Sequence, residues 1–438
     1  MEIILCPREG DVTREIQRAI DECFLAGGGR IVLGEGTYNV GGLRLRSNCT
    51  LFLKRGATLK GTRDVEAYAI LKNETLEPIP EQYKTDDLWE PAKRRASSDF
   101  QTRAASRWNN AIIRIIDAHD VAIIGEEGSV IDGSDPYDKL GEERYRGPHG
   151  ISYHHSASLK FCGYTIKNTG NWAHNGYKST DIEYRGITVL GGHDGIHNSS
   201  CDRYLIEDCS FYTGDDCVAG FDNCDVSVKN CVLNSACSGM RFGGVNVLVE
   251  KCRFYGPAEY FFRGSLSLED KMAGNPSPRS GRKNMLALFT YYSDFSLKIR
   301  YLPKNIIIRD CVVENCDRFL HFDFTGTHVW QRNKPLTGIS FENIRASGIG
   351  MAINAYGDVD NPLTLRLKDC DIGFSRPVEC AVRSGNFRLI SAENLRLCNV
   401  TGALVKGYGG IGEIRAEGVS GVTELLRETD EAFESESI

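Results

Sequence analysis

Short runs in which apolar and polar residues alternate recur along most of the chain. Each run is about five residues long and is bounded by Asn, Asp or Gly, which is typical of β-strands separated by turns. The pattern repeats clearly from 180 to 256 and less regularly from 305 to 425, with a period of about 20 to 25 residues. Examples of such strands are Asn305–Arg309, Thr337–Phe341 and Leu363–Leu367.

The period predicts a solenoid made of strands. Repeats of this length without helical intervals indicate an all-β chain folded as a single-stranded right-handed parallel β-helix. A leucine-rich repeat is the competing solenoid, but its regular leucine and asparagine spacing is absent from the sequence. We therefore expect the strands of successive coils to pair in parallel.

A helical pattern precedes the strands. Residues 12–26 carry apolar residues at positions 12, 16, 19, 20 and 24, which would share one face of an amphipathic helix. Asp11 or Thr13 can cap its first turn, and Gly27–Gly29 ends it. We expect this N-terminal helix to cover the open end of the stack, where unpaired strand edges would otherwise invite aggregation.

The strand pattern predicts one domain over residues 1–425. Two irregular segments interrupt it at 74–108, which is rich in Glu, Pro, Lys and Arg, and at 264–284, which is rich in Pro and Gly. We expect both to leave the coil as excursions, the second being either a solvated loop or a cover over the cleft. Residues 426–438 form an acidic C-terminal tail that we expect to be frayed.

Composition and charge fit a globular enzyme. The 438 residues are 41% hydrophobic and carry a formal net charge of −7. No apolar run approaches the roughly 20 residues that span a bilayer, and Met1–Arg8 lacks the features of an export signal. We expect a cytoplasmic protein that binds neither membranes nor nucleic acid, and its oligomeric state is left open.

The 16 cysteines include no pairs with the spacing of a zinc site. Cys209, Cys231 and Cys252 instead recur at intervals of 22 and 21 residues in similar segments, and Cys311 ends another such segment. We expect these thiols to stack as small apolar groups in the core. We predict no metal and no cofactor.

Acidic residues recur at one point of the repeat. Asp194 and Asp216 are 22 positions apart, Asp215 precedes the second, and Ser238 follows another 22 positions on. Equivalent residues of neighbouring coils lie roughly 4.8 Å apart, and two carboxylates at about 5 Å repel by roughly 3 kcal/mol at an effective dielectric of about 20. One of the three should therefore keep its proton near neutral pH while the others stay ionised. An acid and a base in one cleft are what cleavage of a glycosidic bond requires.

The segments around these acids resemble the polygalacturonase family, glycoside hydrolase family 28. That family carries Asn-Thr-Asp-Gly, Gly-Asp-Asp about one coil later, Gly-His-Gly and then Arg-Ile-Lys, and here Gly192–Gly195 and Gly214–Asp216 match the first two segments. The resemblance implies a pectinase-type parallel β-helix. It also implies that Asp215 donates a proton to the leaving oxygen, while Asp194 and Asp216 position and activate the attacking water.

The chain departs from the family pattern beside the acids. His193 stands where the family has threonine, and Ser238, a candidate contact to substrate, stands where it has histidine. The family's basic strand best matches Phe261–Arg263, with Arg263 in place of the lysine and a phenylalanine in place of the arginine. Arg241 lies 22 residues before Arg263 and could restore the second positive charge. Because the family's basic pair holds the sugar carboxylate, the resemblance implies that these arginines bind a uronate or another acidic sugar.

Four further side chains are candidates for substrate binding. His193 and His197 are four apart in a strand region and would share a face, with Asp194 pointing to the other side if the strand is regular. We favour hydrogen bonding to substrate for both histidines over metal binding. Tyr291 and His321 lie in segments rich in aromatic and polar residues, a composition that suits sugar rings although it is commoner in buried cores.

These expectations converge on a glycoside hydrolase of short oligosaccharides that contain uronate, such as those of pectin. The resemblance implies inversion at the anomeric carbon, whereas carboxylates about 5 Å apart would favour retention. Two other functions stay open: a lyase or uronate epimerase that uses an arginine base and Ca²⁺, and a carbohydrate-binding solenoid without catalysis. An unsaturated product that absorbs ultraviolet light would indicate the first, and binding without product the second.

Overall fold

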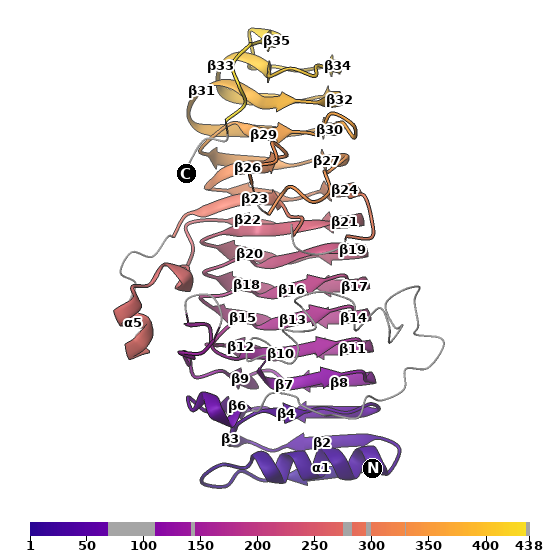
Figure 1. Ribbon diagram of the computed structural model, residues 1–438, viewed down its shortest axis with the longest axis vertical. Helices are drawn as coiled ribbons and strands as arrows, with labels where there is room; N and C mark the ends of the chain where they lie inside the picture. Colours follow the sequence, from indigo (N-terminus) through magenta and orange to yellow (C-terminus); the bar gives the residue numbers. More distant parts are fainter. Residues whose placement is uncertain (69–109, 142–144, 275–282, 295–298, 329, 435–438) are drawn as a thin grey trace. The chain divides into compact units, whose positions relative to one another are not determined.

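The computed structural model describes residues 1–68, 110–141, 145–274, 283–294, 299–328 and 330–434. The chain forms two compact units, of which unit 1 comprises residues 1–215 and 260–282 and unit 2 comprises residues 216–259 and 283–438. Each unit is a stack of short parallel strands (Figure 1).

Unit 1 begins with strand β1 (Glu2–Leu5) and helix α1 (Thr13–Leu25), and most of its other elements are strands. These strands are β2 (Gly29–Leu33), β3 (Gly36–Val40), β4 (Leu43–Arg44), β5 (Cys49–Leu53), β6 (Ala57–Gly61), β7 (Ala111–Ile116), β8 (His119–Gly125), β9 (Val130–Asp132), β10 (His149–His154), β11 (Ala157–Cys162), β12 (Thr165–Lys167), β13 (His174–Tyr177), β14 (Thr180–Arg185), β15 (Thr188–Gly191), β16 (Ile196–Ser199), β17 (Asp202–Glu207) and β18 (Ser210–Thr213). The unit also contains the 3₁₀ helices η1 (Val65–Ala67) and η4 (Arg263–Ser265) and helix α5 (Leu268–Ala273).

Neighbouring coils of unit 1 pair in parallel, with equivalent positions in register. Strand β11 lies between β8 and β14, so that Leu159 is level with Val121 on one side and with Ile182 on the other. All three side chains are buried. The apolar residues of one coil therefore stack on those of the next, and the core runs through the inside of the coils.

Helix α1 covers the first coil of unit 1, as the amphipathic pattern predicted. The buried residues of its inner face are Ile16, Ala19, Ile20 and Cys23. The side chain of Gln17 exchanges two hydrogen bonds with the backbone of Arg44 in β4. The Asp11 carboxylate accepts a hydrogen bond from the N–H of Thr13 at 2.7 Å, which satisfies a donor at the start of the helix. Neither α1 nor any other helix in the described ranges is long and apolar enough to cross a membrane.

Unit 2 contains only strands among its described elements. They are β19 (Val218–Lys229), β20 (Val232–Ser235), β21 (Ser238–Glu250), β22 (Arg253–Tyr255), β23 (Met285–Tyr291), β24 (Lys304–Arg309), β25 (Val312–Glu314), β26 (Cys316–Asp323), β27 (Gly338–Glu342), β28 (Arg345–Ile349), β29 (Ile353–Tyr356), β30 (Leu363–Lys368), β31 (Asp371–Gly385), β32 (Phe387–Glu393), β33 (Arg396–Gly407), β34 (Glu413–Glu417) and β35 (Glu424–Glu428).

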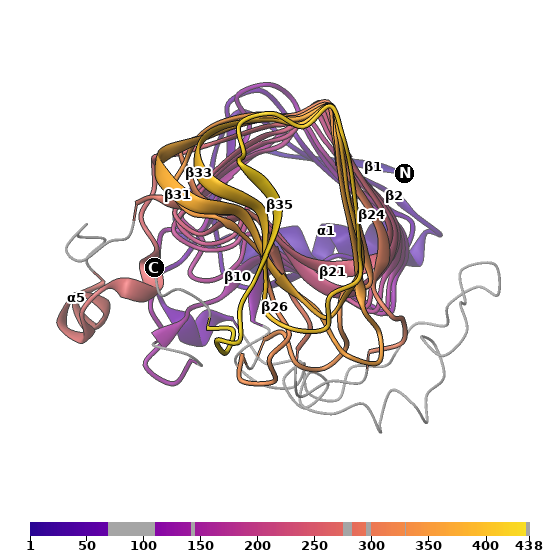
Figure 2. The same cartoon turned by 90° about the horizontal axis from the view of Figure 1, so that it is seen from above.

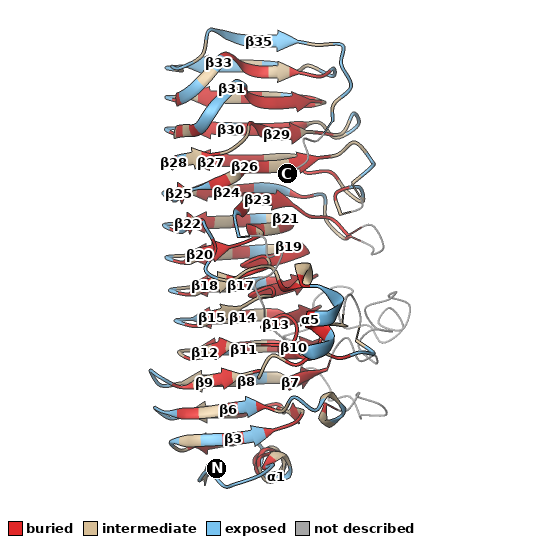
Figure 3. Cartoon of the chain, turned by 90° about the vertical axis from the view of Figure 1, so that its left-hand side faces the viewer, coloured by how far each residue is buried: buried red, intermediate tan, exposed pale blue. Residues whose placement is uncertain are grey.

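The strands of unit 2 are also in register. Val247, Ile306, Ile339, Leu365 and Ile390 are level with one another on β21, β24, β27, β30 and β32. All five are buried, and the coils of unit 2 lie over one another when seen end on (Figure 2). Buried residues follow the strands of each unit, whereas the last strand, β35, is largely exposed (Figure 3). The predicted parallel β-helix with an N-terminal helix is confirmed; the single domain over residues 1–425 stays a prediction.

The cysteines predicted to stack in the core are buried. Cys209, Cys231, Cys252 and Cys311 are between 1% and 3% exposed. Each Sγ lies within hydrogen-bonding distance of the carbonyl oxygen two residues earlier. The predicted packing of these thiols is therefore confirmed.

Of the two predicted excursions, only the second includes residues that the structure describes. Residues 74–108 lie outside the described ranges, as do residues 275–282 within the second excursion. The rest of the second excursion includes helix α5, where the sequence predicted an irregular loop. Ser267 begins this helix, because its Oγ accepts a hydrogen bond from the N–H of Asp270 at 3.1 Å.

The C-terminal tail packs against the last coils of unit 2. The ring of Phe433 stacks on Tyr356 with centroids 4.5 Å apart, and the carboxylate of Glu431 lies 3.2 Å from Nζ of Lys406. The expectation of a frayed tail is therefore wrong as far as Phe433, because an aromatic ring and an acid both find partners on the coils.

Candidate active site

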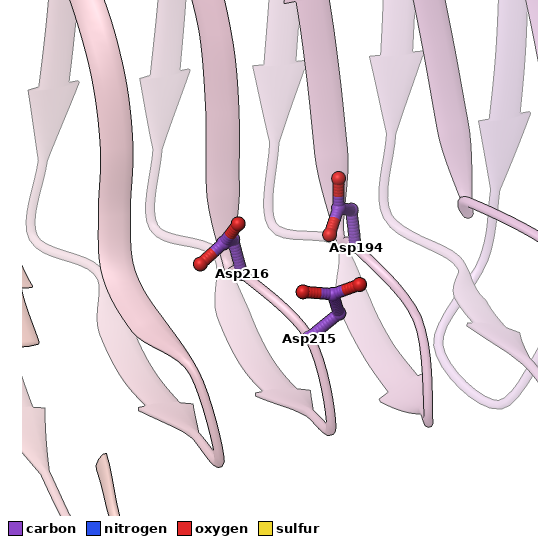
Figure 4. A group of neighbouring side chains, drawn as sticks. All are labelled: Asp194, Asp215 and Asp216. Atoms are coloured by element: carbon purple, nitrogen blue, oxygen red, sulfur yellow. The ribbon is translucent and has the colours of Figure 1, made fainter. Parts of the chain in front are cut away.

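Three carboxylates meet where strands of successive coils end. Asp194 lies in the bend between β15 and β16, and Asp215 and Asp216 lie in the equivalent bend between β18 and β19. One carboxylate oxygen of each lies within 4.8 Å of the other two, and the three side chains are neighbours in Figure 4. The structure thus brings together the three residues that were predicted to be catalytic.

Two glycines allow a distant segment of unit 1 to pack against these bends. A Cβ on Gly214 would overlap the carbonyl oxygen of Phe261, and one on Gly192 would lie 2.7 Å from Cβ of Arg263. The N–H of Arg263 donates to the carbonyl oxygen of Gly192 at 3.0 Å. A side chain at either glycine would therefore displace the segment at 261–263.

An imidazole holds Asp194. This carboxylate is 3% exposed, and its Oδ2 lies 2.7 Å from Nδ1 of His197. The ring of His197 stacks on Trp172, with centroids 3.8 Å apart and planes 7° apart. In a regular strand Asp194 would point away from His197, but the bend between β15 and β16 breaks the strand alternation and brings the two side chains together. His197 positions a carboxylate, where the sequence predicted a contact to substrate.

Asp215 faces an arginine to which the sequence pattern assigned no role in the site. Nη2 of Arg146 lies 3.8 Å from Oδ2 of Asp215. Its Nη1 donates to Oδ1 of Asn171 at 2.9 Å, and the guanidinium lies 5.9 Å from the ring of Trp172. Arg146 belongs to the segment between β9 and β10, outside the strand register, so the repeat could not relate it to Asp215.

His193 lies among cations. Its ring is buried, with Nδ1 3.4 Å from Nη1 of Arg146 and Nε2 3.5 Å from Nη1 of Arg263. Burial, followed by the charges of these two arginines, holds the pKa of His193 well below its usual range. The ring is therefore neutral. His193 and His197, which were predicted to share a face, have surroundings of opposite charge.

Arg263 is bound by the protein itself. Its side chain is buried, and Nη1 forms an ion pair with Oδ1 of Asp135 at 2.6 Å. The guanidinium also donates to the Tyr137 hydroxyl at 2.6 Å and to carbonyl oxygens of Asp135, Pro136 and Thr169 at 3.1 to 3.2 Å. The Arg263 guanidinium was predicted to bind a sugar carboxylate, and these contacts within the protein occupy it.

In unit 2, the backbone holds Asp216. Its Oδ1 accepts a hydrogen bond from the N–H of Ser238 at 2.8 Å, and its Oδ2 lies 3.8 Å from Nη1 of Arg241. The Ser238 hydroxyl instead bonds to the Thr290 hydroxyl at 2.9 Å. Arg241 is 24% exposed and lies over the ring of Tyr292 at 4.0 Å. Ser238, a predicted site residue, thus contacts Asp216 through its backbone. Arg241 is exposed enough for an acidic ligand to reach it.

The other two predicted ligand contacts lie on β23 and β26. Tyr291 is fully buried and donates its hydroxyl hydrogen to the carbonyl oxygen of Lys334, so it has no surface to offer a ligand. His321 is half-buried and level with Thr290. Burial, followed by the charge of Arg318, lowers the pKa of His321 to about 3. Of the two, only His321 keeps exposed surface.

Three close carboxylates are also a set of ligands that a divalent cation accepts. Arg146 lies 3.8 Å from Asp215 and Arg241 lies 3.8 Å from Asp216. These positive charges compete with a metal ion for the same carboxylates. The arrangement therefore favours proton transfer over cation binding.

Comparison with known proteins agrees with this geometry. The family model described as "Glycosyl hydrolases family 28" matches residues 86–248, which include all three carboxylates. A protein of Vitis vinifera described as a probable polygalacturonase is 29% identical over 219 residues, which are 47% of this chain and 40% of that protein. A polygalacturonase of Saccharomyces cerevisiae is 28% identical over 123 residues, which are 26% of this chain and 34% of that protein. The chain thus spans well under half the length of these curated relatives.

The fold comparison covers more of the chain. An exopolygalacturonase from Thermotoga maritima, known from its crystal structure, has a TM-score of 0.66 and 17% identity, and the match covers 91% of this chain and 92% of that one. At this identity the likeness shows the fold alone, which is a parallel β-helix. The segment at residues 86–248, which carries the acids at 194, 215 and 216, is thus similar to glycoside hydrolase family 28, in agreement with the resemblance seen in the sequence.

Proposed function

We propose that this protein is a glycoside hydrolase that cleaves short, uronate-containing oligosaccharides related to pectin. The observation that carries the proposal is the group of three carboxylates with oxygens within 4.8 Å of one another. Arg146 beside Asp215 and Arg241 beside Asp216 support a substrate that carries negative charge.

Asp215 is the proton donor in this proposal. As the bond between the anomeric carbon and the glycosidic oxygen breaks, Asp215 transfers its proton to that oxygen, and the leaving group departs as an alcohol. A water adds its oxygen to the anomeric carbon and gives a proton to Asp194 or Asp216. The return of that proton to Asp215, through solvent, restores the starting charges, and each turnover consumes one water.

Asp194 and Asp216 are each fixed by a short hydrogen bond. One oxygen of Asp194 contacts His197 at 2.7 Å, and one oxygen of Asp216 contacts the N–H of Ser238 at 2.8 Å. Two fixed carboxylates beside the proton donor can both accept hydrogen bonds from the attacking water. We therefore propose inversion at the anomeric carbon. Proton magnetic resonance of the first anomer released tests this step, and a retained anomer would contradict it.

The test of the proposal is hydrolysis of a panel of oligouronides and neutral oligosaccharides. The wild type should release new reducing ends, and Asp215→Asn should lower turnover on the order of 1000-fold while its circular dichroism stays unchanged. Asp208→Asn is the matched control: Asp208 is an exposed turn residue with φ 55°, a conformation that asparagine also adopts. Wild-type turnover in Asp215→Asn would rule out its role as proton donor.

The same assay distinguishes the other functions. An unsaturated product that absorbs ultraviolet light and disappears with a chelator would identify a lyase. Calorimetric binding without product on prolonged incubation would identify a carbohydrate-binding protein.

A cytoplasmic location stays a prediction, which cell fractionation would test.

A further inference from the structure

The segment between β9 and β10 of unit 1, described except for residues 142–144, ends beside the acids. An isolated antiparallel bridge joins Tyr137 to Arg146. The N–H of Gly147 donates to the carbonyl oxygen of Gly170 at 3.0 Å. These contacts tie the β9–β10 segment to itself and to the next coil, and they hold Arg146 beside Asp215.

Arg263 fixes the β9–β10 segment from another side. Its guanidinium contacts three consecutive residues of that segment: the Asp135 carboxylate at 2.6 Å, the Pro136 carbonyl oxygen at 3.2 Å and the Tyr137 hydroxyl at 2.6 Å. It also lies over the Tyr137 ring at 3.7 Å. Loss of a buried arginine leaves such acceptors unpaired, which is costly. Arg263 therefore clamps the segment that carries Arg146.

Arg146 is half-buried and lies beside Asp215. Its side chain is 12% exposed, and its Nη2 lies 3.8 Å from Oδ2 of Asp215. A charge-assisted hydrogen bond would be roughly 2.7 to 2.9 Å long. Asn171 orients the guanidinium at 2.9 Å, and the neutral ring of His193 lies beside it. A half-buried cation 3.8 Å from the proton donor is placed to reach the carboxylate of a sugar bound at Asp215.

We propose that Arg146 determines the specificity of the site for acidic sugars, with its guanidinium binding the carboxylate of the sugar next to the bond that Asp215 cleaves. This inference rests on the proposed hydrolase function. The planar fork of arginine matches a carboxylate with two parallel hydrogen bonds, which a neutral sugar cannot reproduce. A sugar carboxylate bound to Arg146 also draws the guanidinium away from Asp215. Asp215 is then available to protonate the leaving oxygen. In this proposal Arg146 recognises the negative charge of the sugar, and Arg263 holds Arg146 in place.

The test compares an oligouronide with the same oligomer whose carboxyl groups are methyl-esterified. The ratio of kcat/KM for the acid to kcat/KM for the ester is measured for the full-length wild type, Arg146→Gln and Arg146→Lys. The ratio should fall on the order of 100-fold in Arg146→Gln, mainly through KM for the acid. Arg146→Lys should restore part of it, because lysine keeps the charge and loses the fork. A ratio that stays within about threefold of the wild-type value in both variants overturns the inference.

Two further variants separate recognition from folding. Arg203→Gln removes an exposed arginine of unit 1 that pairs with Asp181, and it should keep the wild-type ratio. Arg263→Gln should lower both the melting temperature and the ratio, because it releases the β9–β10 segment; a wild-type ratio in this variant contradicts the clamp. If circular dichroism shows that Arg146→Gln does not fold, Arg146→Lys carries the comparison.

The outcome also separates this inference from the proposed function. A wild-type protein that cleaves neither oligomer overturns the hydrolase proposal and this inference with it. A wild-type protein that cleaves the acid, with a preference that the Arg146 variants leave unchanged, overturns the role of Arg146 alone.

Discussion

Asp194 and Asp216 are 22 residues apart at the same point of the repeat, and they are held in different ways. The His197 side chain contacts Asp194, whereas the backbone N–H of Ser238 contacts Asp216. A backbone donor is present for almost any residue at position 238, but the imidazole contact is lost when His197 is replaced. A chain without a histidine at position 238 can therefore still order its acids, provided that other groups hold them.

Removal of either carboxylate should have the largest effect. Asn at position 194 or 216 keeps the size of the side chain but cannot take a proton from water, so kcat should fall on the order of 1000-fold in both variants. Hydrolysis of an oligouronide measures the effect, with circular dichroism as the check on folding. If Asp194→Asn or Asp216→Asn kept more than roughly a tenth of the rate, that carboxylate would not be needed to activate the water.

Loss of the imidazole should have the next largest effect. His197→Ala removes the group that orients Asp194, so kcat should fall on the order of 100-fold while KM changes less. His197→Gln, which can still donate to the carboxylate, should recover part of the loss. His119→Ala is the matched control, because His119 pairs with Asp120 at 2.9 Å at the start of β8 in the same unit. Equal losses in His197→Ala and His119→Ala would show a general effect on folding.

His193 should affect the dependence of stability on pH. In the unfolded chain a histidine binds its proton near pH 6.5, whereas burial and the nearby arginines hold the pKa of His193 well below that value in the folded protein. As the pH falls below about 6.5, the unfolded state binds more protons than the folded state, so stability is lost. His193→Gln should therefore lose less stability than the wild type between pH 7 and pH 5 in urea unfolding. Parallel losses would mean that His193 is protonated in the folded protein.

Replacement of the Ser238 side chain should have the smallest effect. Ser238→Ala keeps the N–H that contacts Asp216 and loses only the hydrogen bond to Thr290. We expect a cost of about 1 kcal/mol in the free energy of unfolding and a kcat within about threefold of wild type. Thermal unfolding and steady-state kinetics measure the two quantities. A loss as large as that of His197→Ala would show that the hydroxyl acts on substrate.

The proximity of Asp194 and Asp216 could be predicted because it follows from the repeat of the sequence. Strand register brings equivalent positions of successive coils together, and 194 and 216 are one repeat apart. The contact between Asp194 and His197 could not be predicted in this way. It forms across the bend between β15 and β16, where the alternation of side chains no longer applies.

The arginines show the limit of the repeat more clearly. Arg241 could be placed near Asp216 because both lie on the coil, whereas Arg263 was expected at the substrate and instead clamps the β9–β10 segment. Arg146 was assigned no role from the sequence, although it faces Asp215. By itself the sequence determined the coil, the N-terminal helix and the position of the three acids, since each depends on a local or periodic pattern of residues. Only the tertiary structure decided which cation stands beside which acid, because the β9–β10 segment and the chain at 261–263 leave the coil, and long-range contacts set where they return.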